Sequence, residues 1–354
     1  MNKKPTISQV ASLANVSTQT VSRVINNREC VAPETRLRVK AAIEKIGYHP
    51  NPIARRLKYG HSHALGFILP DISNPLFGDA MKGADSYIRN SEHENYEIIF
   101  YNTDGVPGRE KKAIDLFVDR QMEGIIIASS ASDMIVEHIR ELIKNQNIVF
   151  VAVDNQLGDL NIDLLSPDNF QGAYLLTSHL ISLGHRLISI ITGPLNESSS
   201  IGRLEGYKAA LLDNGILFNE NIVFEGDWTK ENSQKITTKI IGLNPRPTAI
   251  FASNNSMSLG ALLTLKTQKI NVPDEIAVVS FDDVENGDLL SPALTTTNTS
   301  WYALGLEASK LLLKRINQKD KSPHKTINLP VDIVIRESCG SKILEQNVKD
   351  KSSY

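Results

Sequence analysis

Residues that could support catalysis are few in this sequence, and their spacing does not suit a reaction. Asp282 and Asp283 are paired carboxylates, but they are adjacent at one strand end, so their side chains diverge, and no second carboxylate is identifiable at the separation of a glycosidase pair. His179 and His185 lie around a helix end, which indicates packing or capping rather than metal binding. No P-loop, Gly-x-Gly-x-x-Gly, nucleophile elbow or zinc-helix motif occurs. We therefore predict that the chain is not an enzyme and holds no metal or cofactor.

Polar residues near the N-terminus have the chemistry to read DNA. Thr18, Gln19 and Arg23 fall on the outward face of a predicted helix, where Gln can pair with adenine and Arg with guanine. Exposed polar residues on a helix are common. The hypothesis therefore depends on the fold that positions these three side chains.

That fold is predicted as three short helices that close one small core. Thr6 and Gln9 form a capping box at the start of the first helix. Asn15 tolerates the left-handed backbone of the turn that follows, and Ser17 caps the second helix. A third helix is predicted over residues 33–46. Two short helices across a tight turn form a helix-turn-helix, whose second helix enters the DNA major groove.

The charge distribution supports a nucleic-acid partner for this segment. The chain has 354 residues and a net charge of −2, but residues 1–60 hold eleven Lys and Arg against three acids. A basic N-terminal segment (the head) on an otherwise acidic chain indicates a module that binds a polyanion such as nucleic acid. The rest of the chain then has a different function. A solvated basic helix face is the simpler alternative, but the excess covers a domain-sized unit that also contains the helix-turn-helix pattern.

From about residue 64 the chain alternates short apolar runs with helix-length segments. The runs are predicted to be buried parallel strands, at Ala64–Leu69, Glu97–Tyr101, Gly124–Ala128, Ile148–Val153, Leu187–Thr192, Ile222–Phe224, Ala249–Ala252 and Ile276–Phe281. Helices are predicted between them, for example at Asp79–Asn90, Arg109–Arg120, Gln171–Leu183 and Gly202–Asn214. The segment is too long for one doubly wound sheet, so we expect an α/β body of two lobes with a ligand crevice at the carboxyl ends of the strands.

The head carries four motifs in a specific combination, which are Val16–Asn26, Thr35–Arg36, Gly47–Asn51 and Ala54–Lys58. Together they closely resemble the DNA-binding head of the lactose/galactose-repressor (LacI/GalR) family of bacterial transcription regulators. One departure is Ala32, where relatives often have a capping Ser or Thr. The head pattern and the resemblance together give a set of candidate DNA-binding residues: Thr6, Ser17, Thr18, Gln19, Thr20, Ser22, Arg23, Asn26, Asn51, Ala54, Leu57 and Lys58.

Residues 51–57 are predicted to form a hinge helix of barely two turns, with Asn51 as its cap. A helix this short is marginal in water unless something packs on it. In the family this helix folds on DNA beside its copy from the second subunit, and a leucine matching Leu57 wedges between base pairs in the minor groove. The resemblance thus implies that Leu57 bends the duplex while Lys58 meets a phosphate or groove edge.

The likeness continues across the body, in the segments Leu65–Gly66, Asp71–Pro75, Gly124–Ile126, Gly184–His185, Gly202–Tyr207, Ser280–Asp283, Pro292–Thr296 and Arg336–Ser338. It therefore covers nearly the whole chain and implies a body like that of periplasmic binding proteins. Asn255 departs from the aspartate that is usual at its position. By matching position and by location at strand ends, the candidate effector-binding residues are Asp71, Asn74, Phe77, Asp154, Arg203, Trp228, Asn254, Asp282 and Trp301.

The residue types of this set favour a sugar. A pyranose has hydroxyls around its edge and apolar C–H faces, so its site needs carboxylates, amides and Arg at the edge and an aromatic plate on a face. Arg203 with Asp282 or Asp154 can grip neighbouring hydroxyls. Trp228 and Trp301 can cover a face, although one of them could instead belong to the core.

We therefore predict a sequence-specific transcriptional regulator, a repressor of carbohydrate-utilisation genes, that is controlled by a mono- or disaccharide bound between two lobes. Either sign of control fits the sequence. Two alternatives are a regulator of the same family that responds to a purine or nucleoside, and a non-secreted sugar-binding protein. A periplasmic receptor would need an export signal, which the N-terminal segment does not resemble.

The expected organisation is a DNA-binding head at residues 1–50, a hinge helix and linker at 51–63, an effector-binding and dimerisation domain at 64–340 and a flexible tail at 341–354. We expect a homodimer on palindromic operator DNA, because one three-helix head covers only a few base pairs. The tail lacks sustained apolar heptads, so a coiled-coil tetramer is not expected. Two distant cysteines and the absence of a long apolar run predict a cytoplasmic protein without a membrane span.

Overall fold

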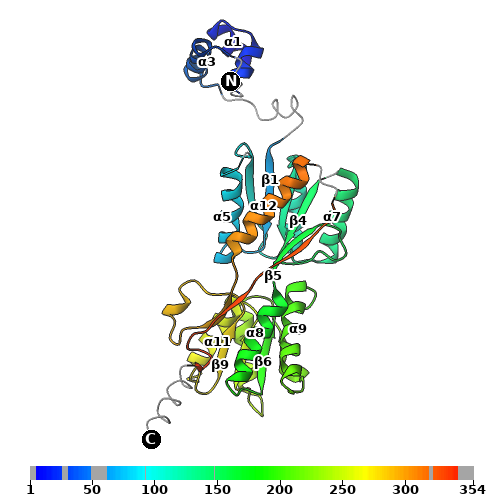
Figure 1. Cartoon of the computed structure of the whole chain (residues 1–354), viewed down its shortest axis with the longest axis vertical. Helices are drawn as coiled ribbons and strands as arrows, with labels where there is room; N and C mark the ends of the chain where they lie inside the picture. Colours follow the sequence, from blue (N-terminus) through cyan, green and yellow to red (C-terminus); the bar gives the residue numbers. More distant parts are fainter. Residues whose placement is uncertain are drawn as a thin grey trace. The chain divides into compact units, whose positions relative to one another are not determined.

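The computed structural model describes residues 5–25, 31–48, 62–91, 93–146, 148–318 and 322–341. The chain divides between Ser62 and His63 into two compact units, the head and the body (Figure 1). The predicted hinge helix and almost all of the predicted tail lie outside the described residues, as do Asn26, Asn51, Ala54, Leu57 and Lys58.

The described part of the head contains three helices, α1 (Ile7–Ala14), α2 (Thr18–Ile25) and α3 (Pro33–Ile46). The capping box is confirmed, since Thr6 N donates to Gln9 Oε1 at 2.8 Å and Gln9 N donates to Thr6 Oγ1 at 3.4 Å. The predicted turn is also confirmed, with Asn15 at a φ of 51°. Ala32 provides no side-chain cap for α3. The three helices bury one apolar core, formed by Val10, Ala11, Ala14, Val21, Val24, Val39, Ala42 and Tyr48.

The body contains two six-stranded sheets, one in each lobe. The sheet of lobe 1 has the order β11-β5-β4-β3-β1-β2, with bounds β1 Ala64–Leu69, β2 Glu97–Asn102, β3 Gly124–Ala128, β4 Val149–Val153, β5 Asp163–Pro167 and β11 Thr326–Leu329. The sheet of lobe 2 has the order β12-β10-β9-β8-β6-β7, with bounds β6 Ile188–Thr192, β7 Val223–Glu225, β8 Ala249–Ala252, β9 Ala277–Ser280, β10 Thr295–Asn298 and β12 Asp332–Val334.

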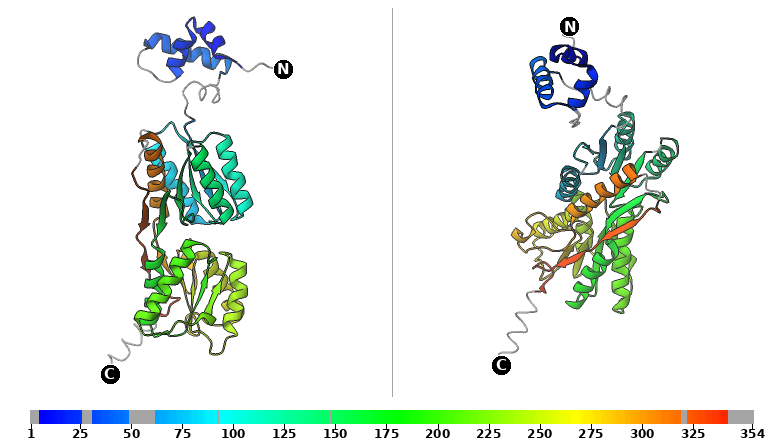
Figure 2. Two further views of the ribbon diagram at one scale, coloured as in Figure 1. Left: turned by 90° about the vertical axis from the view of Figure 1, so that its right-hand side faces the viewer. Right: turned by 45° about the horizontal axis from the view of Figure 1, so that its top comes forward.

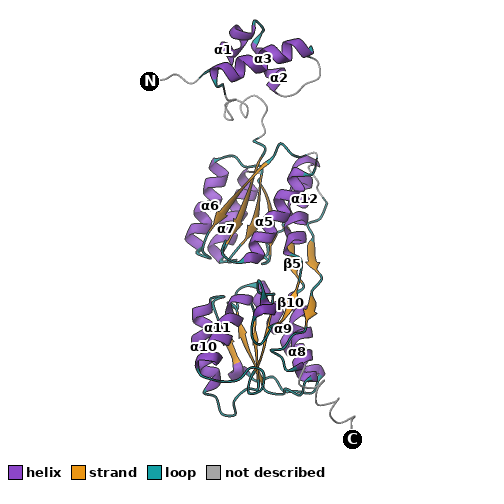
Figure 3. Ribbon diagram, turned by 90° about the vertical axis from the view of Figure 1, so that its left-hand side faces the viewer, coloured by secondary structure: helices purple, strands orange, loops and turns teal. Residues whose placement is uncertain are grey.

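Helices cover both faces of each sheet, so each lobe has three layers (Figures 2 and 3). In lobe 1 one apolar core lies under α5 (Pro75–Arg89) and α12 (Trp301–Gln318), and a second lies under α6 (Pro107–Asp119) and α7 (Asp133–Gln146). In lobe 2 the two cores lie under α8 (Asn169–Ser182) with α9 (Ser198–Asp213), and under α10 (Lys230–Ile241) with α11 (Asn255–Thr267). Short 3-10 turns occur at Glu220–Ile222 and Gly287–Leu289.

The predicted two-lobed α/β fold is confirmed, with one departure in strand direction. Strand β12 pairs antiparallel with β10, whereas the other pairs in both sheets are parallel. The sequence did not predict β5, β10, β11 or β12, which are three to five residues long and each contain polar residues or proline. These strands flank the places where the chain passes between the lobes, after β5, after β10 and after β11.

Four helices begin earlier than predicted. Helix α5 begins at Pro75 and α6 at Pro107, and in both a proline occupies the first turn, where its missing N–H costs nothing. Helix α8 begins at Asn169, after Asp168 accepts a hydrogen bond from Gln171 N, and α9 begins at Ser198. The residues of these first helical turns were expected to be loop, although proline, asparagine and serine are all common at the start of a helix.

Within the described residues, no helix is long and apolar enough to cross a bilayer. The same residues contain no group of three or more His, Cys, Asp or Glu side chains suited to hold a metal ion. His179 Nε2 instead lies 3.2 Å from Cys339 Sγ, and His185 Nδ1 lies 2.9 Å from Thr248 Oγ1. Both histidines therefore have packing partners, as their spacing indicated.

Candidate functional site

A cavity of about 480 Å³ lies between the two lobes of the body, at the carboxyl ends of their strands. Lobe 1 contributes residues that follow β1, β2, β3 and β4, and lobe 2 contributes residues that follow β6, β7, β8 and β9. Parallel strands bring these ends to one edge of each sheet, which is where α/β proteins bind ligands. The predicted crevice is therefore present.

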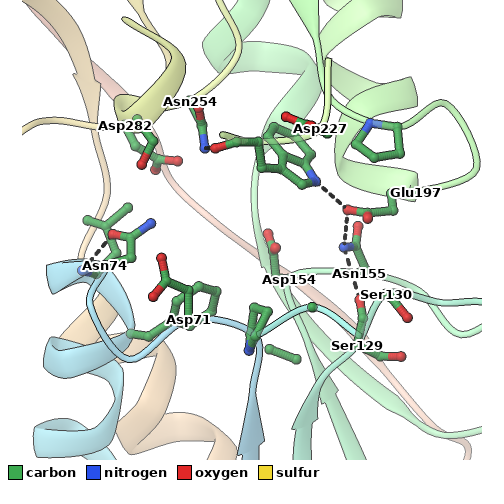
Figure 4. Close-up of a pocket in the computed structure, with 18 of the residues that line it drawn as sticks. Asp71, Asn74, Ser129, Ser130, Asp154, Asn155, Glu197, Asp227, Asn254 and Asp282 are labelled. Atoms are coloured by element: carbon green, nitrogen blue, oxygen red, sulfur yellow. Dashed lines mark hydrogen bonds between the residues drawn. The ribbon is translucent and has the colours of Figure 1, made fainter. Parts of the chain in front are cut away.

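All nine candidate effector-binding residues line this cavity: Asp71, Asn74, Phe77, Asp154, Arg203, Trp228, Asn254, Asp282 and Trp301. The carboxylates of Asp71, Asp154 and Asp282 face the same space (Figure 4). Asp154, Trp228 and Asp282 have φ values of 70°, 67° and 63°, a left-handed backbone that costs energy for residues other than glycine. Such conformations cluster at binding sites, because they aim side chains that a regular backbone would turn elsewhere.

Arg203 is held rigidly in the wall of the cavity, with 3 % of its surface exposed. Its Nε donates to Asn169 Oδ1 at 2.8 Å, and its Nη1 donates to the carbonyl oxygen of Ser253. The guanidinium carbon lies 3.8 Å from the centroid of the Phe281 ring. Nη2 lies 3.8 Å from Asp282 Oδ2, which is an ion pair but too long for a hydrogen bond.

Trp301 and Asp282 connect the lobes on one side of the cavity. Trp301 begins α12 in lobe 1, and its Nε1 donates to Asp282 Oδ1 of lobe 2 at 3.3 Å. Its ring packs edge-on against Phe77, with 5.4 Å between the centroids. Trp301 is 5 % exposed, so it serves the core of lobe 1 as well as the cavity wall.

An amide pair joins the lobes through Asn74 and Asn255. Asn255 Nδ2 donates to Asn74 Oδ1 at 3.1 Å, and Asn74 Nδ2 donates to Asn255 Oδ1 at 3.4 Å. Each residue also accepts a backbone hydrogen bond at the start of a helix, Asn74 from Leu76 and Asn255 from Ser256. An aspartate at 255 would have no donor for Asn74 Oδ1. Asparagine at 255, where the family usually has aspartate, therefore makes this hydrogen bond between the lobes possible.

Glu197 is the main site residue that the sequence did not indicate. It precedes α9 and is 8 % exposed. Its Oε2 accepts two hydrogen bonds at 2.9 Å, one from the indole nitrogen of Trp228 and one from Asn155 Nδ2 of lobe 1 (Figure 4). Asn155 Oδ1 in turn accepts from Ser199 N at 3.0 Å, so a side chain of lobe 1 caps a helix of lobe 2.

Other residues absent from the predicted set follow strand ends. Ser129 and Ser130 follow β3 and line the cavity, and both hydroxyls donate to the buried carboxylate of Glu110. Asp104 and Asp227 follow β2 and β7 in the same way. Asp154 and Asp282, which the resemblance supplied, also follow strand ends, whereas Glu197 lies further from its strand.

The buried carboxyls of the cavity have raised pKa values. Burial raises the pKa of Glu197 to about 7, against the hydrogen bonds from Trp228 and Asn155. Burial raises the pKa of Asp154 to about 6, although the charge of Arg203 opposes the change. Burial also raises the pKa of Asp282. Because a raised pKa means that the ionised form is disfavoured, the ligand-free cavity holds its negative charges at a cost.

Replacing Glu197 with glutamine should stabilise the ligand-free protein at high pH. An ordinary glutamate ionises near pH 4.5, whereas Glu197 ionises at about 7, so folding stability is lost as the pH rises between these values and stays lower above them. The glutamine oxygen can still accept from Trp228 and Asn155 but carries no charge. At pH 8 the variant should exceed the parent by up to about 3 kcal/mol, and at pH 4.5 the two should be similar.

Urea unfolding of both proteins at the two pH values measures this difference. Glu220→Gln removes the same charge from an exposed position of lobe 2 and is the matched control, with a change below about 0.5 kcal/mol expected at either pH. A difference between parent and Glu197→Gln that did not vary with pH would contradict the explanation.

In the head, the three residues assigned to base contact lie on α2 and are exposed: Thr18, Gln19 and Arg23. Thr6 and Ser17 are exposed at the helix starts, whereas Thr20 and Ser22 are partly buried. Ser17 Oγ accepts from Thr20 N at 3.1 Å, so Ser17 caps α2 as predicted. The first turn of α2 thus presents polar side chains to solvent on the helix that a helix-turn-helix inserts into DNA.

Comparison with known proteins gives the same division of the chain. Residues 6–51 match the family model of bacterial regulatory proteins of the lacI family, and residues 62–337 match that of periplasmic binding proteins and the sugar binding domain of the LacI family. The HTH-type transcriptional repressor PurR of Histophilus somni (strain 2336) is 31 % identical over 333 residues, which cover 94 % of this chain and 98 % of the relative.

Two of the solved structures that are similar over 95 % of this chain are each 26 % identical to it. The lac repressor dimer bound to operator and the anti-inducer ONPF superposes with a TM-score of 0.83 over 99 % of its chain, and a complex of the transcriptional regulator CelR with cellobiose superposes with 0.71 over 100 %. The relatives are transcriptional repressors and regulators, which confirms that the chain is not an enzyme. The protein therefore belongs to the LacI family, as a DNA-binding transcriptional repressor with an effector-binding domain.

Proposed function

We propose that the protein represses transcription as a homodimer on a near-palindromic operator, and that a small polar molecule in the interlobe cavity controls its affinity for that operator. The exposed polar first turn of α2 supports base reading, and the cavity between two lobes supports effector control. The lac repressor, a structural neighbour, is a dimer on its operator. The strongest support for the proposal is that all nine candidate effector-binding residues line one cavity.

A sugar-like effector is the first candidate. The cavity offers carboxylates, amides and one guanidinium around its edge, with Trp228, Trp301 and Phe77 as aromatic walls. That combination suits a ring of hydroxyls with apolar faces. The regulator CelR, whose solved structure is similar, was solved with cellobiose. On this proposal the protein regulates genes of carbohydrate use.

A purine or nucleoside is the second candidate, and the sequence relatives favour it, since repressors that are 31–32 % identical to this chain are named PurR. Flat purine rings also stack on aromatic side chains. The asparagines Asn74, Asn155 and Asn254 line the cavity and offer both donors and acceptors, as base edges require. A ligand screen must therefore contain both classes.

Control would follow from linkage. An effector that makes different contacts with two lobe arrangements shifts the equilibrium between them, and operator DNA shifts the same equilibrium through the head. The lobes already touch through Trp301–Asp282, Asn74–Asn255 and Asn155–Glu197. These contacts surround the cavity, so a ligand there acts directly on the lobe arrangement.

Selection of bound sequences from a random DNA pool tests the DNA side of the proposal. The full-length protein should enrich a near-palindromic site with two half-sites, as a two-fold symmetric dimer requires. Enrichment of sequences without a two-fold relation would contradict the dimer, and no enrichment above the pool would contradict sequence-specific binding.

Replacing Arg23 separates base reading from charge. Arg23→Ala should cost about 1–3 kcal/mol at the base pair it reads and should relax base preference there. Arg23→Lys keeps the positive charge but lacks the two-pronged donor geometry, so it should lose the preference while retaining most of the salt dependence. Binding of both variants to the selected site and to its single-base variants is the measurement. Unchanged base preference in Arg23→Lys would remove Arg23 from base contact.

A further inference from the structure

The cavity is strongly acidic. Of the described residues that line it, six carry carboxyl groups, Asp71, Asp104, Asp154, Glu197, Asp227 and Asp282, and one, Arg203, carries a positive charge. Asp71, Asp104 and Asp227 are exposed and have partners nearby: Asp71 accepts from Ser73, Asp104 pairs with Arg109, and Asp227 accepts from Thr229. Solvent reaches these three carboxyls, so the cost of burying negative charge falls on the deeper ones, Asp154, Glu197 and Asp282.

Arg203 does not neutralise all three. Its Nε and Nη1 are taken by Asn169 and the Ser253 carbonyl oxygen, and Nη2 faces Asp282 at 3.8 Å. Glu197 has neutral partners, an indole and an amide. Asp154 receives no hydrogen bond from the described residues, and its Oδ1 is buried without any partner. Arg203 thus forms its ion pair with Asp282, and its charge acts on Asp154 and Glu197 only without direct contact.

The unused acceptor atoms belong to these same two carboxyls. Both hydrogen bonds to Glu197 end on Oε2, and no described residue donates to Oε1. Figure 4 shows Asp154 and Glu197 on neighbouring parts of the cavity wall, one from each lobe. A ligand group with several donors and a positive charge would satisfy both carboxyls and offset the cost of keeping them ionised and buried.

From this geometry we propose that the effector carries a protonated amine, as an amino sugar does, and that Asp154 and Glu197 bind the ammonium group. The inference rests on the proposed function, because it names the effector class for the same cavity. The hydroxyls of such a ligand meet Arg203, Asp282 and the asparagines, and a sugar face stacks on Trp228. A phosphorylated ligand fits less well, since the one guanidinium among the described lining residues already faces Asp282.

Isothermal titration of the full-length chain near pH 7 tests the proposal with matched ligands. Glucosamine and galactosamine should bind at least about tenfold more tightly than glucose and galactose, because the ammonium group adds charge-assisted hydrogen bonds. The corresponding hexose 6-phosphates should not bind measurably. Hypoxanthine, guanine and adenosine complete the panel. Stronger or equal binding of a neutral sugar, a purine or a phosphate would overturn the inference, as would no binding by either amino sugar.

Variants assign the preference to particular residues. Asp154→Asn and Glu197→Gln remove one charge each without changing shape, and each should reduce the preference for the amine over its parent sugar to below about threefold. Glu220→Gln, the exposed control, should keep the full preference. Circular dichroism confirms that the variants are folded. An undiminished preference in both folded cavity variants would overturn the assignment.

The same ligands distinguish failure of the inference from failure of the proposed function. A neutral sugar or purine that binds best and changes operator affinity would overturn the amine and leave effector control intact. An amino sugar that binds best but leaves operator affinity unchanged would support the amine and contradict effector control.

Discussion

Replacing Arg203 with alanine should abolish the response to effector while DNA binding without effector stays near normal. Arg203 is 3 % exposed and lies beside Asp282, which is 5 % exposed. Its removal takes away the hydrogen bonds to Asn169 and Ser253 and leaves a buried carboxyl without its cation. The expected cost is about 3–5 kcal/mol in the free energy of unfolding. No effect on DNA contacts is expected, because Arg203 belongs to the body and not to the head.

Asp282→Asn provides a gentler version of the same experiment. The amide oxygen can still accept from Trp301 Nε1, but the negative charge opposite Arg203 is gone. Operator affinity of both variants is measured with and without the ligand that the parent binds, and circular dichroism checks the fold. If the effector releases DNA, the variants remain bound, and if it promotes binding, they remain released. A folded variant that responds at the parent's ligand concentration would exclude these residues from the site.

Gly83→Ala should destabilise lobe 1 by about 1–3 kcal/mol or more and reduce the affinity of the cavity for its ligand. Helices α5 and α12 cross so closely that a Cβ on Gly83 would overlap the carbonyl oxygen of Tyr302, and one on Gly305 would overlap that of Ala80. Backbone atoms cannot rotate away as a flexible side chain can, so the helices would have to separate. Phe77 of α5 and Trp301 of α12 would move with them, and both line the cavity.

Gly78→Ala is the matched control on the same helix. A Cβ at Gly78 meets nothing within 4 Å. Alanine restricts the unfolded chain more than glycine, so this variant should gain about 0.5–1 kcal/mol. Urea unfolding gives both free energies, and ligand titration gives the effect on the cavity. Equal stability of the two variants would contradict the close helix contact.

Local sequence signals predicted the head well, because each depends on neighbouring residues. The capping box of Thr6, the left-handed turn at Asn15 and the helix end at Gly47 all follow from the conformational preferences of single residues. The apolar strands of the body are equally local, and the eight predicted strands match observed strands to within about two residues at their ends. Buried parallel strands must be apolar on both faces, so their sequences are distinctive.

The strands at the lobe crossings could not be predicted, since only tertiary structure explains their residues. Asp163 begins β5 and is fully buried, which a single sequence argues against. It is tolerated there because Arg315 of α12 donates to it twice, at 2.7 and 2.8 Å. Such a pair joins residues far apart in the chain, and no local pattern reveals it.

Some residues of the candidate site could be predicted from the sequence, and others could not. Resemblance to a family supplied Asp154, Arg203 and Asp282, and the fold brings them to one cavity. Glu197 was missed because a glutamate before a helix is ordinarily solvated. Its burial depends on Asn155 of the other lobe and on the indole of Trp228. A residue that contributes to the charge of the cavity is thus recognisable only from tertiary structure.

Reciprocal titration tests the central claim, that ligand in the cavity and operator on the head share one equilibrium. Operator affinity is measured with and without saturating effector, and effector affinity is measured with and without saturating operator DNA. The two ratios must be equal by thermodynamic linkage, and a coupled repressor should give a factor of about 5–150. Effector binding that is the same in the presence and absence of operator would contradict the account.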